Sequence, residues 1–195
     1  MSQLMFFNGL LTITLAIVFS GSISEAKASQ KGGKGPVRAT AEIQGCDNAT
    51  DVSGRAMLKE RKSEEGVKQV DVSLMVKGLT PGKHAVHIHE TAECVPCGAA
   101  GGHFDPGPFG FTSPDGNHPF HSGDLINIEA NRRGLAHLNT TTTRVTLSPG
   151  PLSLFDADGS AFIIHVNTDT YCPNGEESGC AGGSRAACGV IELDD

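Results

Sequence analysis

Two histidines, His87 and His89, stand two residues apart, and Val86 and Ile88 alternate with them. In an extended strand, side chains at positions i and i+2 point to the same face. Both imidazoles would therefore lie on one face of a strand, while the aliphatic side chains face the core. Imidazoles held rigidly together are a good beginning for a transition-metal site. A His-x-His pair alone is more often an ordinary polar strand face, so a metal site requires further ligands from elsewhere in the chain.

Further candidate ligands lie in a long irregular stretch and at the end of a later apolar segment. Residues 90–124 are rich in Gly and Pro, show no hydrophobic period and contain three histidines; residues 167–184 form a second irregular stretch. A loop as long as the first is uncommon in a compact domain unless it has a function. The additional candidates are His103, His121, Asp124 and His165.

The rest of the chain predicts an all-β domain that would position these side chains. Short segments of alternating apolar and polar residues recur between turns, and residues 70–76 are the clearest case. This pattern predicts a Greek-key β-sandwich or flattened barrel with two long functional loops. Strands are expected at about residues 37–43, 52–60, 67–77, 83–89, 125–130, 134–138, 143–147, 161–166 and 186–192.

Residues 1–26 indicate a secretory signal peptide. The apolar run Leu10–Phe19 precedes small residues and is too short to span a membrane, although no Lys or Arg comes before it. Residues 27–36, rich in Lys, Gly and Ser, predict a disordered lead-in. Residues 37–195 would then form one secreted, extracellular domain with no membrane span.

Charge and cysteine content narrow the partners and the compartment. The formal net charge of −7 argues against nucleic acid, but a small anion remains compatible if positive charge is concentrated locally. Six cysteines fit an oxidising compartment, and their even number allows all of them to pair. Asn48 and Asn139 begin N-glycosylation sequons, which agrees with a secreted glycoprotein.

Taken in chain order, the motifs resemble those of copper/zinc superoxide dismutases, over residues 37–192. They are His84-x-x-His87-x-His89, Gly101-Gly102-His103-Phe104-Asp105-Pro106, His121-Ser122-Gly123-Asp124-Leu125, His165, and Gly183-Ser184-Arg185-Ala186-Ala187-Cys188-Gly189. The resemblance implies a flattened eight-stranded Greek-key barrel. It also implies an antioxidant oxidoreductase that converts superoxide to oxygen and hydrogen peroxide by redox cycling of copper. A homodimer is compatible with it, because the family is often dimeric.

The resemblance assigns a role to each matching residue. The implied copper ligands are His87, His89, His103 and His165, and the implied zinc ligands are His103, His121 and Asp124. His103 would bridge the two ions and take up a proton during the reaction. Asp169 would link the ligands of both ions, His84 would brace the site, and Arg185 would attract the superoxide anion.

The resemblance also implies a disulfide. Cys97 and Cys188 would anchor the metal-site loop to the last strand. Cys172 with Cys180 could then close a small loop, which leaves Cys46 to pair with Cys94.

One position departs from the family pattern. The family has a further zinc-binding histidine eight residues after the bridging one, and this position is Phe111 here. A phenyl ring cannot bind zinc, so the sequence predicts a degraded zinc site with weakened affinity. Three arrangements remain open: a centre with copper alone, His118 as a substitute ligand, or water completing a three-ligand site. His118 lies outside the family spacing, and its ordinary interpretation is an exposed loop histidine.

Two functions fit these residues. The first is a secreted superoxide dismutase, for which the copper ligands, Asp169 and Arg185 are all present. The second is a weakly active or non-catalytic metal-binding protein of plasma or matrix. The chain is also similar to secreted invertebrate proteins of the cavortin, dominin and pernin type, including their disrupted zinc site. Glu176 and Glu177 occupy the loop that steers substrate in the family, and no Lys accompanies them, which lowers the expected attraction of superoxide.

Overall fold

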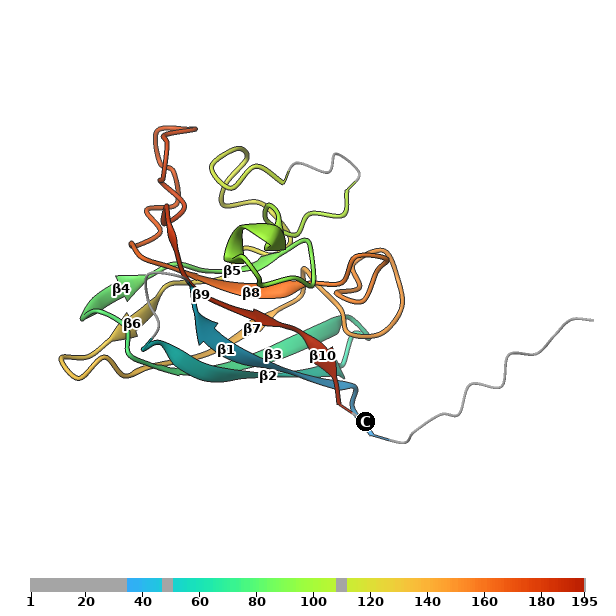
Figure 1. Cartoon of the computed structure of the whole chain (residues 1–195). Helices are drawn as coiled ribbons and strands as arrows, with labels where there is room; N and C mark the ends of the chain where they lie inside the picture. The colour runs from blue at the N-terminus through green and yellow to red at the C-terminus, as the bar shows by residue number, and fades with distance from the viewer. Residues whose placement is uncertain (1–34, 47–50, 108–111, 195) are drawn as a thin grey trace, which may run out of the picture. The chain divides into compact units, whose positions relative to one another are not determined.

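The computed structural model describes residues 35–46, 51–107 and 112–194. The expected signal peptide, most of the lead-in, Asn48 and Phe111 lie outside the described residues, and what the sequence predicts for them stays a prediction. Within the described ranges the chain is all-β, a nearly closed antiparallel barrel with almost no helix (Figure 1). No helix in those ranges is long and apolar enough to cross a membrane.

One sheet contains all the strands of the described chain. They are β1 (Arg38–Gly45), β2 (Ser53–Lys62), β3 (Lys68–Lys77), β4 (Gly82–His84), β5 (Val86–His89), β6 (Ile128–Ala130), β7 (Ala136–Thr142), β8 (Ala161–His165), β9 (Arg185–Val190) and β10 (Glu192–Leu193), and the short 3-10 helix η1 is Cys97–Ala100. The strand order is β4-β6-β7-β3-β2-β1-β9-β8-β5, with β10 beside β1. The two end strands, β4 and β5, are consecutive in sequence and separated by Ala85 alone, so the sheet nearly closes on itself there. The expected eight strands are recovered when β4 and β5 count as one interrupted strand and the two-residue β10 is set aside.

The central strands follow the predicted alternation. On β3, Val70, Val72, Leu74 and Val76 are buried, while the residues between them point outward. β3 pairs with β2 along its whole length, from Ser53↔Lys77 to Lys62↔Lys68. Branched aliphatic side chains pack well on a pleated, half-buried face, so this pair forms a rigid wall of the barrel core.

The expected strand at residues 143–147 is wrong. β7 extends to Thr142 instead, and beyond it Thr146 forms only an isolated bridge with Ser153. The buried carboxylate of Glu60 accepts the backbone N–H of Leu147 at 2.7 Å and of Ser148 at 2.9 Å. The side chain of Glu60 therefore accepts the hydrogen bonds that a neighbouring strand would otherwise accept from this backbone. The apolar residues of this segment can be buried without forming a strand, because the buried backbone N–H groups already have partners.

The disulfide pairing differs from the expectation in two of three bonds. The structure pairs Cys172 with Cys180 as expected, but it pairs Cys94 with Cys188 and Cys46 with Cys97. The predicted Cys97–Cys188 and Cys46–Cys94 bonds are therefore wrong.

The register of β1 and β9 explains this pairing. Gln44 lies opposite Cys188. Cys46 follows two residues later, and its backbone N–H donates a hydrogen bond to the carbonyl oxygen of Ala186. Cys46, directly after β1, thus lies beside Cys188 on β9, and the loop containing Cys94 and η1 meets both of them. The bonded Cα atoms are 5.8 Å apart for Cys46–Cys97 and 5.6 Å apart for Cys94–Cys188, ordinary distances for disulfides.

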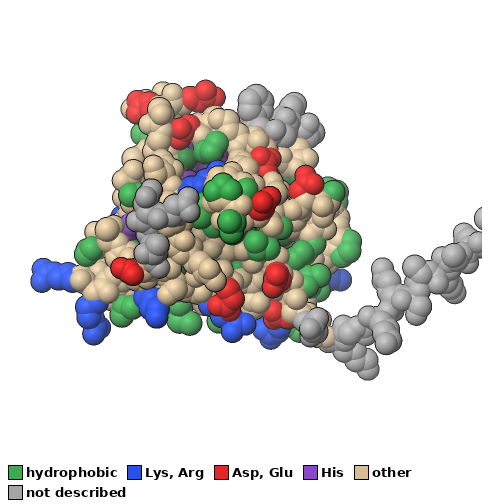
Figure 2. Space-filling model, in the orientation of Figure 1, with side chains coloured by type: hydrophobic (Ala, Val, Ile, Leu, Met, Phe, Trp, Pro, Cys, Tyr) green, Lys and Arg blue, Asp and Glu red, His purple; other side chains and the backbone are tan. Residues whose placement is uncertain are grey.

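Two long loops rise on one side of the barrel, next to β5 and β8 (Figure 1). The first runs from residue 90 to residue 127 and the second from residue 166 to residue 184, close to the predicted stretches 90–124 and 167–184. Figure 2 shows acidic side chains gathered at the upper edge, where the second loop stands. The barrel thus presents β5 and β8 as a rigid floor beneath two irregular segments.

We expect Phe162→Ala to lower the free energy of unfolding by about 3–5 kcal/mol. Phe162 is fully buried on β8, and truncation would leave a cavity in the core. Met75→Ala is the control, because Met75 is 52% exposed on β3 and should cost less than about 1 kcal/mol. Denaturant titrations with the disulfides intact measure both variants, and equal losses would contradict this description of the core.

Candidate metal centre

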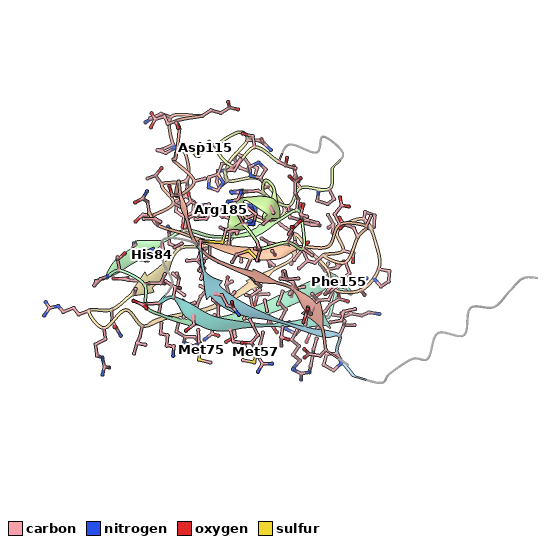
Figure 3. All side chains as sticks on the ribbon, viewed as in Figure 1. Met57, Met75, His84, Asp115, Phe155 and Arg185 are labelled. Atoms are coloured by element: carbon pink, nitrogen blue, oxygen red, sulfur yellow. A yellow bond between two sulfur atoms is a disulfide. The ribbon has the colours of Figure 1, made fainter. Side chains whose placement is uncertain are left out.

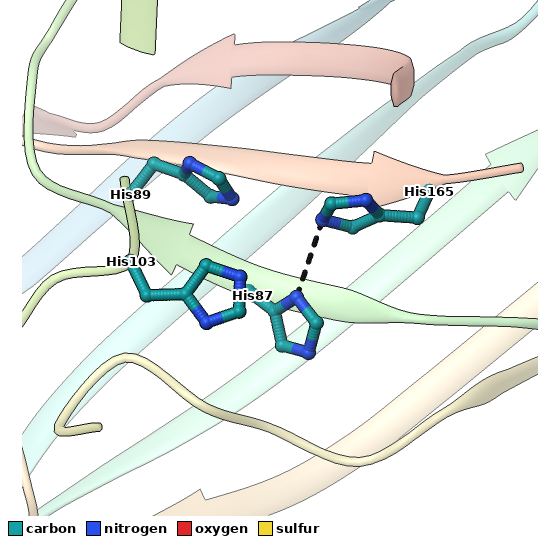
Figure 4. Close-up of side chains that lie close together, drawn as sticks. All are labelled: His87, His89, His103 and His165. Atoms are coloured by element: carbon teal, nitrogen blue, oxygen red, sulfur yellow. Dashed lines mark hydrogen bonds between the residues drawn. The ribbon is translucent and has the colours of Figure 1, made fainter. Parts of the chain in front are cut away.

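Four histidine side chains meet above β5 and β8 (Figure 4). They are His87, His89, His103 and His165, all buried, and each offers a ring nitrogen within 4.8 Å of the others. His87 and His89 belong to β5, and His165 ends the neighbouring strand β8. An isolated bridge between His89 and His103 brings in the first loop. The structure therefore brings together all four residues that the resemblance assigns to copper.

Oxygen atoms behind three of these rings fix which nitrogen carries the proton. His89 Nδ1 lies 3.0 Å from the carbonyl oxygen of Gly101, and His165 Nδ1 lies 2.8 Å from that of Gly183. His87 Nε2 lies 3.0 Å from a carboxylate oxygen of Asp169. Carbonyl and carboxylate oxygens only accept, so each of these ring nitrogens donates its proton, and the other nitrogen keeps a free lone pair.

The free nitrogens face one another inside the cluster. His87 Nδ1 and His165 Nε2, the two atoms joined by the dashed line in Figure 4, are 3.2 Å apart. His89 Nε2 and His103 Nε2 are buried and lack a hydrogen-bond partner in the described part of the chain. Buried polar atoms without partners are costly, and facing lone pairs repel unless a cation lies between them. Four imidazole nitrogens in this state fit a transition-metal ion such as copper, zinc, iron or nickel.

A second cluster adjoins the first at His103 and centres on the carboxylate of Asp124. Asp124 oxygens lie 2.7 Å from His103 Nδ1, 3.1 Å from His118 Nδ1 and 3.0 Å from His121 Nδ1. All four residues are buried, and His118 Nδ1 forms no hydrogen bond despite the short distance. The ligand atoms of His103, His118 and Asp124 lie, together with one of His87, within 4.8 Å of one another, while His121 joins them through its contact with Asp124. Three imidazoles and one carboxylate are a donor set that suits a tetrahedral zinc site. His103 has one ring nitrogen directed to each cluster, which suits a bridging residue.

Asp169 connects the two clusters. Its carboxylate oxygen Oδ2 lies 3.0 Å from His87 Nε2 and 2.8 Å from His118 Nε2. Its other oxygen accepts the backbone N–H of Tyr171 at 2.6 Å. Asp169 therefore orients one imidazole of each cluster at the same time, as a linking carboxylate would.

His118 is not the exposed loop histidine that its ordinary interpretation predicts. Its side chain is buried between Asp124 and Asp169, and its ring lies parallel to the ring of Tyr171. A turn in which Phe120 donates to the carbonyl of Asn117 brings His118 into the cluster. Sequence spacing could not show this, because the approach depends on an irregular turn rather than on a strand or helix period.

Arg185 lies next to the four-histidine cluster. Its guanidinium donates to the carbonyl oxygen of Cys97 at 2.5 Å and to that of Gly101. Gly101 also accepts the Nδ1 proton of His89, so one carbonyl places the guanidinium beside that ring. Figure 3 shows Arg185 between the loops and the sheet. A partly exposed guanidinium fixed in this way is suited to attract a small anion to the cluster.

Two more residues hold the site from outside. His84 lies 2.8 Å from the carbonyl oxygens of both His165 and Thr80, and so braces the end of β8 as expected of it. Arg144, which sequence reasoning missed, donates to the carbonyl oxygens of Pro119 and Asp124 in the first loop. Contacts from a side chain to distant backbone carbonyls leave no sequence pattern, so no signal pointed to Arg144.

Comparison with known proteins identifies the family. The family model described as copper/zinc superoxide dismutase (SODC) matches residues 52–191. The chain belongs to the copper/zinc superoxide dismutase family. A copper-zinc superoxide dismutase of Deinococcus radiodurans is 38% identical over 135 residues, which cover 62% of this chain and 69% of the relative. Copper-zinc superoxide dismutase 2 of Aquifex aeolicus is 38% identical over 147 residues, 72% of this chain and 80% of the relative.

A solved structure also matches the superoxide dismutase fold of this chain. It is the crystal structure of a double mutant of a SOD-like protein from Bacillus subtilis, with 29% sequence identity and a TM-score of 0.59. The match covers 77% of this chain and 95% of the other. These comparisons confirm the family that the motifs indicate, while secretion and the similarity to plasma proteins stay predictions.

Burial lowers the pKa of all four histidines of the first cluster. Burial lowers the pKa of His103 to about 4 and that of His165 to about 3. Burial, together with the charges of His103 and Arg185, holds the pKa of His89 well below its usual value. Metal ions bind imidazole only in its neutral form, so at neutral pH the free nitrogens are ready to bind.

His118 behaves in the opposite way in the metal-free protein. Burial alone would lower its pKa, but the nearby carboxylates of Asp124 and Asp169 raise that pKa to about 9. Burial would raise the pKa of both carboxylates, but contacts with His103, His118 and His121 lower the pKa of Asp124. Contacts with His118 and His87 likewise lower the pKa of Asp169. A proton on His118 thus balances the negative charge of the second cluster when no cation is bound.

We expect the metal-free protein to be most stable near pH 6.5. The ordinary histidine pKa is 6.5, whereas the pKa values of His103 and His165 in the folded protein are much lower. Below pH 6.5 these two histidines therefore bind protons in the unfolded chain but not in the folded protein, which lowers stability. The free energy of unfolding should fall by on the order of several kcal/mol as the pH drops from about 6.5 to 4. The stabilising contribution of protonated His118 is complete below pH 6.5 and is lost as the pH rises through about 9.

Urea titrations of chelator-treated protein between pH 4 and pH 10 measure this dependence. A stability that does not change between pH 6.5 and pH 4.5 would show that these imidazoles are not buried together in the metal-free chain.

Proposed function

We propose that this chain is a secreted superoxide dismutase that converts superoxide to oxygen and hydrogen peroxide at a copper ion, with zinc beside it. Membership of the family supports the reaction. The observation that carries the proposal is the cluster of four buried imidazoles with Arg185 fixed next to it. The apolar N-terminal run and three disulfides support secretion into an oxidising compartment.

In this proposal the copper ligands are His87 through Nδ1 and His89, His103 and His165 through Nε2. Bound copper would supply one-electron redox chemistry, in which one superoxide gives up an electron and a second superoxide receives it. The carbonyl oxygens of Gly101 and Gly183 keep the rings of His89 and His165 in the correct orientation and tautomer. His103 Nε2 can take up a proton inside the cluster, and this proton would serve peroxide formation.

Arg185 provides the local positive charge that the negative chain otherwise lacks. Burial lowers its pKa, yet a guanidinium stays protonated at neutral pH. Glu176 and Glu177 are exposed in the second loop and repel anions. The attraction of superoxide therefore depends on Arg185 at short range rather than on the charge of the whole surface.

We also propose that zinc is bound by His103, His118, His121 and Asp124. Of the three arrangements that Phe111 leaves open, the burial of His118 beside Asp124 favours the substitute ligand. Asp169 supports this assignment, because it holds Nε2 of His118 and leaves Nδ1 free for an ion. The zinc site would then keep four protein ligands instead of being degraded.

We expect Arg185→Ala to lower the rate constant for superoxide decay by about 10-fold or more. The protein is loaded with copper and zinc, and stopped-flow absorption follows superoxide. Arg133→Ala is the control, because Arg133 is exposed in the turn between β6 and β7 and should leave the rate unchanged. Added salt should slow the unmodified protein more than the Arg185 variant.

Decay no faster than with free copper ions would overturn the dismutase proposal. In that case, abundant zinc and little copper in protein from its natural source would support the metal-binding alternative.

We expect His118→Ala to weaken zinc binding by about 10- to 100-fold, a range like that for lost ligand partners in known metal sites. His137→Ala is the matched control, because His137 is exposed on β7 and contacts neither cluster. Competition with a chromophoric chelator measures both affinities. Equal affinities would show that zinc is held without His118.

A further inference from the structure

Asp115 lies in the first loop, but its carboxylate binds the backbone of the second. Oδ2 accepts the N–H of Gly179 at 2.8 Å, and Oδ1 accepts the N–H of Ala181 at 3.1 Å. Figure 3 shows Asp115 above Arg185, among the loop side chains. Hydrogen bonds to an ionised acceptor are about twice as strong as neutral ones. Asp115 therefore ties the two loops together through a pair of strong contacts.

The segment of the second loop that Asp115 binds continues into residues that contact His165. A Cβ atom on Gly182 would lie 2.8 Å from Cβ of His165, so the backbone packs against this histidine without space for a side chain. The next residue, Gly183, accepts the Nδ1 proton of His165 at 2.8 Å. Three residues separate Gly183 from Gly179, where Asp115 binds. The position of the Gly183 carbonyl, and with it the ring of His165, thus depends on how residues 179–183 are held.

The same segments line a cavity that reaches His165. Its volume is about 430 Å³, and its lining includes Pro114, Asp115, Ser178, Ser184 and His165. One part of the lining comes from the first loop and another from the second. A carboxylate that joins both segments therefore sets how far apart they lie at this cavity.

Other restraints act on the second loop beside this contact. The Cys172–Cys180 disulfide closes a loop within the segment but does not join it to the first loop. Ala181 forms an isolated bridge with Asp169, also inside the second loop. Asp169 joins the second loop to His118 and Asn127, and Gly182 and Ser184 accept the backbone N–H groups of Asn167 and Val166. Asp115, three residues before His118, adds a separate contact, which joins residues 179–181 to the segment that contains the second cluster's ligands.

We propose that Asp115 is a positioning residue that holds residues 179–183 over His165 and fixes both the His165 Nδ1 hydrogen bond and the width of the adjacent cavity. Its consequence for catalysis rests on the proposed function, because the cavity would admit superoxide. The restraint itself is a property of the fold and can be measured without turnover.

The test compares Asp115→Asn and Asp115→Ala with Asp156→Asn in the protein loaded with copper and zinc. Asp156 is a matched control, since its carboxylate also accepts two backbone N–H groups, those of Asp158 and Gly159, in an exposed turn. Asn keeps the size of Asp and one acceptor oxygen, so it preserves folding if Ala does not. A denaturation midpoint for each variant verifies the fold.

Three readouts follow the restraint. A glutamyl endopeptidase should cleave after Glu176 or Glu177 at least about 10-fold faster in both Asp115 variants, because the opened segment is more often accessible. In the diamagnetic cuprous protein, the His165 Nδ1 proton seen by NMR should exchange with solvent at least about 10-fold faster. The dissociation constant of azide, a small anion detected by its absorption with cupric protein, should change at least about 3-fold, while Asp156→Asn leaves all three unchanged.

If cleavage is faster but neither the exchange rate of the His165 Nδ1 proton nor the azide dissociation constant changes, Asp115 only stabilises the second loop locally, and the proposal is overturned. Unchanged cleavage would overturn the restraint itself. Absence of dismutase activity in the unmodified protein would overturn the proposed function, while the cleavage and proton-exchange results would still decide the role of Asp115.

Discussion

The buried carboxylate of Asp169 is the constraint on which the site depends. It contacts one imidazole of each cluster, and its backbone is fixed from both sides by the amide of Asn127, at 2.8 Å and 3.0 Å. A carboxylate only accepts hydrogen bonds, so it requires the protons of both His87 and His118 on Nε2. Both rings must then direct Nδ1 inward. One side chain thus sets the tautomer and orientation of a residue in each cluster and makes the two clusters a single unit.

The barrel and the loops contribute different kinds of restraint. β5 and β8 are packed on a core of Val, Ile and Phe, which places His87, His89 and His165 without room to move. The first loop is irregular, and its position depends on disulfides, on Arg144 and on backbone carbonyls bound by Arg185. Rigid strands are more precise supports than loops. The four-histidine cluster, with three of its residues on strands, is therefore fixed mainly by the fold. The cluster around Asp124 lies in the first loop and is fixed mainly by side-chain contacts.

Sequence reasoning succeeded where a regular period or an ordered motif carried the information. Alternation on β3 and the His-x-His spacing on β5 follow from strand geometry, and the ordered motifs indicated the family. It failed where distant parts of the chain meet. The partner of Cys188 depends on the register between β1 and β9, which no spacing reveals. His118 enters the site through a turn, and Glu60 replaces an expected strand partner with a side chain. In each case the structure depends on a contact between residues far apart in the sequence, and a local sequence pattern cannot predict such a contact.

The central claim is that four ring nitrogens share one ion and that His118 belongs to its neighbour. Anomalous X-ray diffraction from crystals loaded with copper and zinc, recorded at both absorption edges, tests it most directly. The account predicts one copper peak bounded by His87 Nδ1 and by Nε2 of His89, His103 and His165, and one zinc peak in contact with Asp124 and His118 Nδ1. A copper peak elsewhere, or a zinc peak from which His118 is turned away, would contradict it.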